Sequence, residues 1–296
     1  MPYRSVVSPL HEVVQVPPHP RLRPGVQFYR GFRIHAGRPR ERLELPVGFA
    51  TLLLGFDHRI TIGAVGAGRA ADPAGAPRKT YTSLLAGIRT NSVIGVHSGT
   101  VHGIEVVMRP WAAYAMFGVP MHELTERLVD PTDVAGTTMR RLTDRLAEIP
   151  DWPSRFTELD RSLLRRVEDG PGPAPRILRA WDLLVGSAGT MPIADLSREL
   201  DWSERQLERR FREQLGLAPK AAARVLRLQH AMRLLVAGRP LAEIASRAGF
   251  YDQSHLNREI RTATGMTPGV FLSRTLHAPA AAARVDGTVT TLVLQA

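Results

Sequence analysis

A pattern that occurs twice in the C-terminal half of this chain limits its fold more than any other feature of the sequence. Each copy has apolar, glycine and proline residues at matching positions. The segments before them also match, since the run from Ile193 to Leu196 (IADL) corresponds to that from Leu241 to Ile244 (LAEI). A duplicated pattern is far more specific than one isolated match, because each copy tests the other. The matched positions, which recur 49 residues apart, are Leu207 and Leu256, Phe211 and Ile260, Gly216 and Gly265, and Pro219 and Pro268.

The downstream copy has the sequence of two short helices joined by a tight turn. Leu241 and Ile244 keep one face of the first helix apolar. Gly249 follows where the turn needs a positive φ, which glycine adopts at little steric cost. Asp252 or Ser254 can cap the second helix, because either side chain accepts hydrogen bonds from free backbone N–H groups. These features together predict a helix-turn-helix unit.

The second helix of each copy buries apolar residues and turns polar and basic residues outward. Such a face fits the major groove of DNA, where base edges present hydrogen-bond donors and acceptors. In the upstream copy, Ser203 and Gln206 form a capping-box pattern at the start of this helix. The outward residues are Glu204, Arg205, Glu208, Arg209 and Arg212 upstream, and Gln253, Ser254, His255, Asn257, Arg258 and Arg261 downstream.

A long helix separates the two units. Pro219 opens it and Gly238 ends it, and at 1.5 Å per residue it spans roughly 27 Å. That length is near the ~34 Å that separates successive major-groove segments on one face of DNA. The two units are therefore predicted to enter neighbouring segments of the major groove from one chain.

The charge balance favours an anionic partner. The chain has 39 Lys and Arg against 28 Asp and Glu, which gives a net charge of +11. Nearly all of the cations are Arg, which suits bidentate contacts with guanine and phosphate. Genomic base composition accounts for the same excess, since Ala, Gly and Pro are also abundant.

Several classes of protein are excluded by what the sequence lacks. The chain has no Cys, which rules out disulfides, zinc fingers and thiol catalysis. No signal peptide opens the chain, and no apolar run approaches the ~20 residues of a membrane span. We therefore expect a soluble, cytoplasmic protein.

The N-terminal half changes from a strand pattern to a helical one. Short apolar and β-branched runs between turn residues predict strands from Val26 to about Pro110, and their close spacing indicates a small β-barrel or sandwich. From Trp111 to about Asp169 the apolar period is helical. The run Gly170–Pro175 is the clearest linker, and we place the domain boundary there. Strands are predicted at 42–45, 50–56, 60–62, 80–88, 92–97 and 102–108, a loop at 66–77, and helices at 112–117, 121–129, 139–149 and 156–167.

The C-terminal part, from about Arg176 to Leu276, resembles the AraC/XylS family of transcriptional regulators. The matching residues are Leu207-x-x-x-Phe211, Gly216-x-x-Pro219, Arg227 with Ala231, Gly249-Phe250-x-Asp252-x-x-His255-Leu256-x-Arg258, and Gly265-x-Thr267-Pro268. The resemblance implies seven helices whose two helix-turn-helix units bind DNA in successive major-groove segments. It implies base contacts from Arg205, Gln206, Glu208 and Arg209 in the first unit and from Gln253, Ser254, His255 and Arg258 in the second, and Arg212 and Arg261 complete the predicted DNA surface.

Two departures from the family pattern lie in the first unit. Asp201 stands where the family has Gly, so the turn carries a steric cost that Asp tolerates better than most residues. Glu204 and Glu208 place carboxylates on the first recognition helix. A carboxylate accepts a hydrogen bond from cytosine N4 but repels phosphate, which weakens the case for DNA binding by this unit.

Structural roles compete with DNA contact for several of these side chains. Arg209 can pair with Glu213, and Arg205 or Arg212 can pair with Glu208, as exposed ion pairs on a solvated helix. The imidazole of His255 can cap or pack instead of reading a base. The arginines of the long helix either touch phosphate or keep the helix soluble; they are Arg224, Arg227, Arg233 and Arg239.

Regulators of the resembled family often carry a cupin-like sensor barrel in the N-terminal half, and strands followed by helices fit that order. Tyr81, His97, His102 and Trp111 are the candidate lining of a small-molecule pocket, with an ordinary core role as the alternative. The series His97, His102 and Glu105 is a weak match to a cupin metal motif. Its spacing is wrong, and Glu105 points to the opposite face of the strand from His102. We therefore predict no metal site.

The sequence thus predicts an α+β protein, in which a cupin-like β-barrel with flanking helices precedes an all-α domain with two helix-turn-helix units. The helices between Met121 and Glu168 either pair two subunits or cover their own sheet, and the resembled family favours dimerisation. The predicted parts are a flexible N-terminal arm (1–25), a sensing and dimerisation domain (26–170), an AraC-type DNA-binding domain (171–277) and a flexible tail (278–296).

We expect a sequence-specific DNA-binding transcription regulator and not an enzyme. Its predicted partners are double-stranded DNA, RNA polymerase, a small-molecule effector and a second copy of the chain, and no cofactor is expected. We expect control by a small molecule or a dimer contact at the N-terminal domain; an activator is expected, and the sequence leaves a repressor open as the alternative. The alternative is a metal-dependent cupin enzyme with a DNA-binding appendage. An alkylation-repair regulator built on the same module is excluded, because it needs nucleophilic cysteines.

Overall fold

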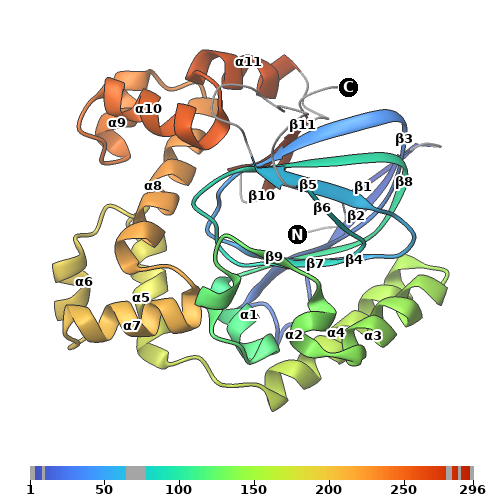
Figure 1. Cartoon of the computed structure of the whole chain (residues 1–296). Helices are drawn as coiled ribbons and strands as arrows, with labels where there is room; N and C mark the ends of the chain where they lie inside the picture. Colours follow the sequence, from blue (N-terminus) through green and yellow to red (C-terminus); the bar gives the residue numbers. More distant parts are fainter. Residues whose placement is uncertain (1–3, 9–10, 65–77, 278–281, 286–287, 294–296) are drawn as a thin grey trace.

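The computed structural model describes residues 4–8, 11–64, 78–277, 282–285 and 288–293. A domain of antiparallel strands, flanked by helices, lies beside an all-helical C-terminal domain (Figure 1). This arrangement confirms the predicted α+β class, with a cupin-like sheet domain followed by a helix-turn-helix domain. Within the described residues, no helix combines the length and the apolar character that crossing a bilayer needs. The loop predicted at 66–77 lies outside the described residues.

The strands of the described residues form one antiparallel sheet. They are β1 (Arg4–Ser8), β2 (His11–Val16), β3 (Val26–Glu44), β4 (Ala50–Gly55), β5 (Ile60–Ala64), β6 (Lys79–Tyr81), β7 (Leu84–Ala86), β8 (Val93–Met108), β9 (Leu128–Val129), β10 (Ala282–Val285) and β11 (Thr288–Val293). The main order is β1-β2-β3-β8-β4-β7-β9. In addition, β5 pairs with β8 and β6, while β11 pairs with β3 and β10.

The two longest strands, β3 and β8, form the centre of the sheet. Extra residues interrupt their pairing between Ala36 and Arg40. On the opposite strand, Gly99 has φ +70°, a conformation that glycine adopts without strain. Such a bulge bends the paired strands. One end of this strand pair consequently pairs with β2 and β4, and the other end pairs with β11 and β5.

The prediction of a flexible arm at residues 1–25 is wrong for the part that the structure describes. β1 pairs with β2, β2 pairs with β3, and both Val14 and Val16 are buried in the core. These valines flank Gln15, so the segment alternates as a half-buried strand does. The following residues are also fixed, because the His19 N–H and the Tyr29 hydroxyl both donate to Asp160 Oδ1 at 2.8 Å.

The flexible tail predicted at 278–296 is likewise wrong in its described part. β10 and β11 pair with each other, and β11 extends the edge of β3. The Thr291 hydroxyl donates to Glu44 Oε2 at 2.6 Å. The residues of β11 are mostly β-branched, which favours a strand. Residues 278–281, 286–287 and 294–296 lie outside the described part.

The helices divide between the two domains. The first group is α1 (Pro110–Phe117), the 3-10 helix η1 (Met121–Leu124), α2 (Pro131–Ala135), α3 (Thr137–Glu148) and α4 (Trp152–Asp169). The second group is α5 (Pro175–Gly186), α6 (Ile193–Glu199), α7 (Glu204–Leu215), α8 (Pro219–Val236), α9 (Leu241–Arg247), α10 (Gln253–Thr264) and α11 (Pro268–His277). The prediction of a helix at 121–129 is wrong, because only η1 forms there and β9 follows it. Glu126 interrupts the helix, because its φ of +56° is incompatible with a right-handed turn.

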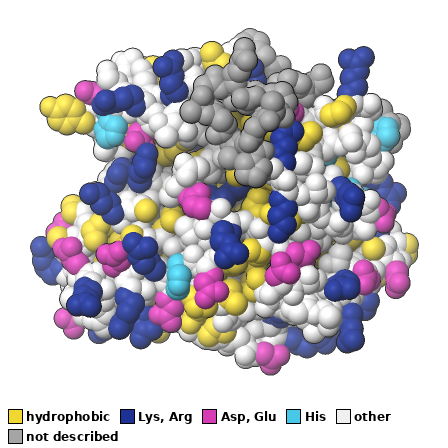
Figure 2. All heavy atoms as spheres, viewed as in Figure 1, with side chains coloured by type: hydrophobic (Ala, Val, Ile, Leu, Met, Phe, Trp, Pro, Cys, Tyr) yellow, Lys and Arg dark blue, Asp and Glu magenta, His cyan; other side chains and the backbone are white. Residues whose placement is uncertain are grey.

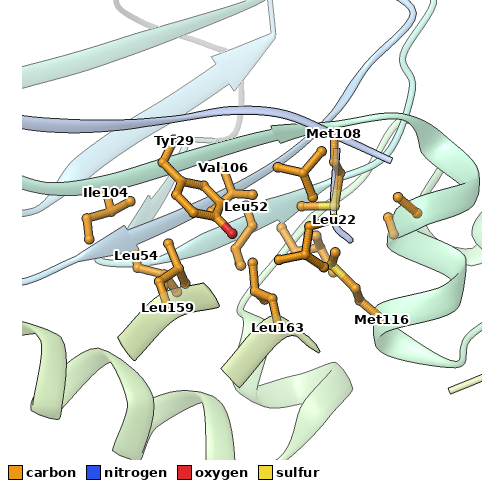
Figure 3. Packing of buried hydrophobic residues seen from close by; sticks show 14 of the residues in the cluster. Leu22, Tyr29, Leu52, Leu54, Ile104, Val106, Met108, Met116, Leu159 and Leu163 are labelled. Atoms are coloured by element: carbon orange, nitrogen blue, oxygen red, sulfur yellow. The ribbon is translucent and has the colours of Figure 1, made fainter. Parts of the chain in front are cut away.

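The core of the N-terminal domain lies between the sheet and the helices α1, α3 and α4 (Figure 3). Tyr29, Leu52 and Ile104 reach it from three strands, and Leu159 and Leu163 reach it from α4. None of these five side chains is exposed to solvent. Each buried aliphatic side chain contributes about 1.5–3 kcal/mol to folding, so this layer fixes the helices on the sheet.

The sheet domain also completes the cores of the helical domain. Ile88, from the loop between β7 and β8, lies in the apolar cluster that contains Trp181 of α5 and Phe211 of α7. On the other side, Leu43 and Ile94 enter the cluster that α8 shares with the second unit. The two domains therefore share apolar cores instead of being joined by the linker alone.

Polar contacts connect the same surfaces. The Thr125 hydroxyl donates to Gly216 O at 2.8 Å, at the C-terminal end of α7. The Gly48 N–H donates to Gln229 Oε1 of α8 at 2.9 Å. The Ser92 hydroxyl donates to the carbonyl of Ala263 in α10. The sheet domain thus holds both recognition helices and the helix between them.

Candidate nucleic-acid interface

The first unit consists of α6, a short turn and α7. Asp201 has φ +51° in this turn, so it adopts the left-handed conformation that the sequence predicts at a position usually occupied by Gly. The Ser203 side chain then accepts a hydrogen bond from Gln206 N at 3.3 Å, which confirms the predicted cap. Leu207 and Phe211 are fully buried under α7. These contacts fix the helix and turn its other side toward solvent.

The second unit repeats this construction in α9 and α10. Gly249 has φ +70°, and a Cβ there would lie 3.1 Å from Thr190 Cγ2, so other residues are disfavoured both by conformation and by space. Of the two predicted capping residues, Asp252 forms the cap, and its carboxylate accepts from His255 N at 2.7 Å. Ser254 is left exposed. Its hydroxyl therefore remains available to a partner.

The exposed face of α7 contains both paired and unpaired arginines. Arg212 donates to Glu208 Oε1 through two nitrogens, at 2.9 and 3.1 Å. Glu213 pairs with Arg210 at 2.8 Å, not with Arg209 as considered from the sequence. Arg205 and Arg209 are exposed and have no ion-pair partner among the described residues. The predicted residues that lie on this face are Arg205, Gln206, Glu208, Arg209 and Arg212.

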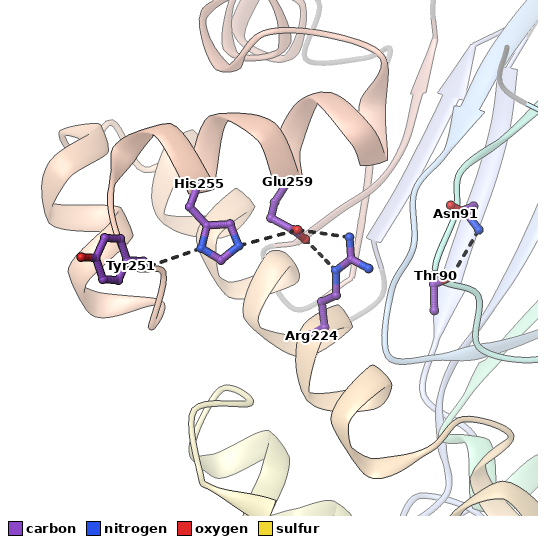
Figure 4. A network of polar contacts seen from close by, with 6 residues as sticks. All are labelled: Thr90, Asn91, Arg224, Tyr251, His255 and Glu259. Carbon is purple, nitrogen blue, oxygen red and sulfur yellow. Dashed lines mark hydrogen bonds and ion pairs between the residues drawn. The ribbon is translucent and has the colours of Figure 1, made fainter. Parts of the chain in front are cut away.

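The exposed face of α10 carries less acid. Arg258 and Arg261 are exposed and lack an ion-pair partner within the described residues. Glu259 lies on the side toward α8, where it accepts two bonds from Arg224, at 2.7 and 3.1 Å (Figure 4). This pair neutralises the carboxylate and fixes α10 on α8. The predicted residues Gln253, Ser254, Arg258 and Arg261 are all exposed on this helix.

His255 is the predicted DNA-binding residue that is least available to DNA. Its side chain is half-buried, its ring meets Phe250 edge-on at 5.4 Å, and its Nδ1 accepts from Tyr251 N at 3.4 Å. Its Nε2 lies 3.8 Å from Glu259 Oε1 (Figure 4). The imidazole therefore makes a hydrogen bond inside the unit through Nδ1, and its Nε2 faces the Glu259 carboxylate from beyond hydrogen-bond distance.

Tyr251 is the residue of this surface that the sequence did not single out. It lies in the turn before α10, and 93% of its surface is exposed. One signal was present: the first helices of the two units start 48 residues apart (241 − 193), while the later positions are 49 apart (256 − 207). The second turn is thus one residue longer than the first, and Tyr251 lies within it.

The arginines of α8 mostly have partners within the protein. Arg227 donates to Gly189 O at 3.0 Å, Arg233 lies 2.8 Å from His230 Nδ1, and Arg224 binds Glu259. Of the four predicted from the sequence, Arg239 follows the helix and is exposed. The 18 residues of α8 place the two units about 27 Å apart along the helix axis.

Figure 2 shows Lys and Arg side chains over the helical domain, on the left, with Asp and Glu among them. The positive charge of this side is consequently not a uniform patch. Its distinguishing feature is the presence of guanidinium groups without an acidic partner among the described residues, on both recognition helices. Such groups can form bidentate bonds with guanine or phosphate.

The four side chains predicted to line a small-molecule pocket lie in separate clusters. Tyr81 belongs to a small apolar cluster on β5, β6 and β7, and its hydroxyl donates to Leu128 O at 2.9 Å. Trp111 packs between the core of the sheet domain and that of the first unit. His97 is buried on β8, where desolvation and the nearby cations Arg42 and Arg40 lower its pKa to about 4. The structure does not bring these groups together around one cavity.

His102 lies on the helix-facing side of β8. Its Nε2 is 3.0 Å from a guanidinium nitrogen of Arg155, and its ring contacts Phe56 and Trp152 edge-on. Desolvation, with Arg33 and Arg155 nearby, lowers its pKa to about 4. Because neutral imidazole nitrogen accepts the bond from Arg155, this histidine is a structural partner of that guanidinium.

A metal site is not formed by the residues considered for it. Glu105 pairs with Arg30 at 2.9 Å on the face of β8 opposite to His102. Within the described part of the chain, no group of three or more His, Asp or Glu side chains is arranged to hold a metal ion. Two hollows among the described residues, one beside Arg224 and Glu259 and one beside Pro46 and Gln229, each have a volume of about 10 Å³, which is room for about one water.

Comparisons with known proteins give two separate matches along the chain. Residues 196–274 match the family described as a helix-turn-helix domain, which covers the range from α6 to α11. Residues 14–130 match a family described as a domain of unknown function (DUF6597), which begins in β2 and ends after β9. The two matches correspond to the helical domain and to the sheet domain.

Curated relatives match over part of their length. YbfI of Bacillus subtilis, an uncharacterized HTH-type transcriptional regulator, is 32% identical over 108 residues, which is 34% of this chain and 39% of YbfI. RhaR of Yersinia pseudotuberculosis, an HTH-type transcriptional activator, is 32% identical over 88 residues, which is 29% of this chain and 30% of RhaR. The chain thus matches less than half the length of either relative.

Among solved structures, ToxT of Vibrio cholerae covers 84% of this chain and 98% of its own, with 12% identity and a TM-score of 0.45. The C-terminal domain of AraT, a response regulator of Geobacillus stearothermophilus, covers 35% of this chain at 23% identity and a TM-score of 0.33.

Proposed function

Through its C-terminal domain the chain belongs to the AraC/XylS family, and on this premise we propose that it is a sequence-specific DNA-binding transcription regulator. One observation carries the proposal. Each of the two recognition helices exposes two arginines that have no acidic partner among the described residues: Arg205 and Arg209 on α7, and Arg258 and Arg261 on α10. A helix that serves only as a solvated surface gains from pairing its charges, and α7 does pair Arg210 and Arg212.

The two recognition helices contribute to DNA binding in different ways. α10 enters the major groove with Gln253, Ser254 and Arg258, whose side chains are hydrogen-bond donors and acceptors for base edges. α7 contributes Arg205 and Arg209, while Glu208 is neutralised by Arg212 and no longer repels phosphate strongly. The helix N-termini add their free N–H groups to phosphate oxygens. The second unit therefore supplies most of the sequence readout.

The sheet domain controls this binding through its contacts with both units. Ile88 packs into the apolar cluster that contains Phe211 of α7. Ser92 binds the carbonyl of Ala263 in α10, and Thr125 binds the carbonyl of Gly216 at the end of α7. A ligand or a second chain that changes these contacts shifts the population of the DNA-binding arrangement by its difference in affinity for the two states. A small-molecule effector, homodimer formation and contact with RNA polymerase belong to this proposal.

The test is selection of bound sequences from a random pool of DNA duplexes by the purified chain, at about 50 and 150 mM salt. The proposal predicts that one sequence motif is enriched at both salt concentrations. Binding without any enriched motif would contradict sequence-specific recognition, because phosphate contacts alone do not depend on sequence. The double variant R205A/R258A is the control, and we expect it to enrich no motif.

A further inference from the structure

The side chain of Tyr251 is exposed to solvent, and the fold of the second unit does not require a tyrosine there. At 93% exposure it is far more accessible than the other large apolar side chains on the described surface; Val270, the next, is 46% exposed. A tyrosine ring is largely apolar, and tyrosines exposed in this way are enriched where proteins bind partners. The position of the ring indicates what that partner is.

The turn of the second helix-turn-helix unit is longer than that of the first by one residue, Tyr251. In the first unit, one residue separates the left-handed Asp201 from the capping Ser203. In the second unit, two residues separate the left-handed Gly249 from the capping Asp252, and they are Phe250 and Tyr251. Phe250 is buried and closes the turn. Tyr251 is thus an insertion that leaves the fold of the unit unchanged and stands in front of α10.

The backbone of Tyr251 is held on both sides. Phe250 is anchored in the core before it, and Asp252 caps α10 after it. Its own N–H donates to His255 Nδ1 at 3.4 Å. His255 is in turn placed against Glu259, which is fixed by Arg224 (Figure 4). The ring is therefore presented from a rigid turn at the N-terminal end of the recognition helix.

We propose that the Tyr251 hydroxyl donates a hydrogen bond to a DNA phosphate beside the groove that α10 enters, and that His255 positions Tyr251 through Nδ1. The inference rests on the proposed DNA binding. Tyrosine is among the side chains that donate to phosphate oxygens, and such contacts set the register of a recognition helix without reading sequence. His255 then acts on binding through Tyr251 and not through a base.

The first test removes only the hydroxyl. We expect Y251F to bind the selected site and random DNA more weakly by the same factor, roughly 2- to 10-fold, as for the loss of one hydrogen bond. The salt dependence should not change, because no cation is lost. V167A, on α4 of the other domain, is the control for an exposed apolar residue. An affinity of Y251F equal to that of the wild type would overturn the proposal, whereas failure of the wild-type chain to bind DNA would overturn the proposed function instead.

The second test separates the two nitrogens of His255. Asn places its carbonyl oxygen where Nδ1 lies, and Gln places its terminal group where Nε2 lies. We expect H255N to bind as the wild type does, and H255Q to lose as much affinity as Y251F. The double variant Y251F/H255Q should be no weaker than either single variant, because both remove one contact. Retained binding by H255Q together with loss by H255N would show that Nε2 reads a base, and would contradict the positioning role.

Discussion

Arginines on the two recognition helices differ in what they can offer to DNA. Arg212 is bound to Glu208, so contact with DNA must first break that exposed pair, whereas Arg258 is exposed and has no partner in the described part of the chain. We expect R258A to weaken binding to the selected site by about 1–3 kcal/mol and to leave random DNA almost unaffected. Competition binding with both DNAs measures this, and R165A, which removes an exposed charge from α4, is the control. Equal losses on both DNAs would show that Arg258 touches only phosphate.

Asp201 offers a test of strain at a single residue. Its φ of +51° is unfavourable for any residue with a Cβ, and its distance to Arg176 is 4.0 Å in a pair that is almost fully exposed on the Asp side. We expect D201G to raise the free energy of unfolding by about 1 kcal/mol. D144G, within α3, should lower it, because glycine is a poor helix former. Chemical denaturation measures both; destabilisation by D201G would mean that the carboxylate has a structural partner.

The end of helix α3 depends on a neutral histidine. Arg155 Nε donates to the carbonyls of Leu146 and Ile149, while another nitrogen of its guanidinium bonds His102 Nε2. Burial lowers the pKa of His102 and of His97 to about 4, below the ~6.5 of an unfolded chain. Between these values the unfolded chain binds more protons, so its population grows as the pH falls.

We therefore expect the free energy of unfolding to be at its full value above about pH 6.5 and to fall as the pH is lowered toward 4. In the variant H102Q, the amide accepts the bond from Arg155 and does not titrate, so the decline should be shallower. Thermal unfolding of both chains at pH 7, 6 and 5 measures the difference. Parallel pH profiles would show that His102 is not among the groups that titrate on unfolding.

The elements of the helical domain could be predicted from the sequence because local signals agree with the fold there. Local backbone geometry is determined by the glycine turn at Gly249, the cap at Ser203 and the proline at the start of α8. The cap and the proline recur in both copies of the pattern. In the N-terminal half, long-range pairing decides the outcome. Val14 and Val16 become a strand only because β3 lies beside them, and no local signal specifies that partner.

The exposure of side chains on α7 and α10 could be predicted to a similar degree, while their contact with DNA stays a proposal. Spacing along a helix determines which side chains share its outer face, so the exposed positions of α7 and α10 follow from the sequence. Which arginine pairs with Glu213 does not follow from the sequence. Arg209 and Arg210 are both close enough to Glu213 along the helix, and only the side-chain rotamers decide between them. The role of Arg224 was also hidden, since its partner Glu259 lies 35 residues away in another helix.

The two domains are coupled by shared apolar cores. Ile88 belongs to the sheet domain but is buried in the first helix-turn-helix unit, with 1% of its surface exposed. We expect I88A to cost about 2–5 kcal/mol and to speed amide hydrogen exchange in α5 and α7. I34A, half-buried on β3, is the control that should leave these helices protected. Faster exchange confined to the sheet domain in I88A would contradict the coupling.

Hydroxyl-radical footprinting on the selected site tests whether both units of one chain bind DNA at once. We expect two protected segments on one face of the duplex, with centres about 10–10.5 base pairs apart, as for two units that enter successive major-groove segments. In R205A/R209A the segment contacted by α7 should lose protection, while the other remains. A single protected segment with the wild-type chain would contradict binding by both units.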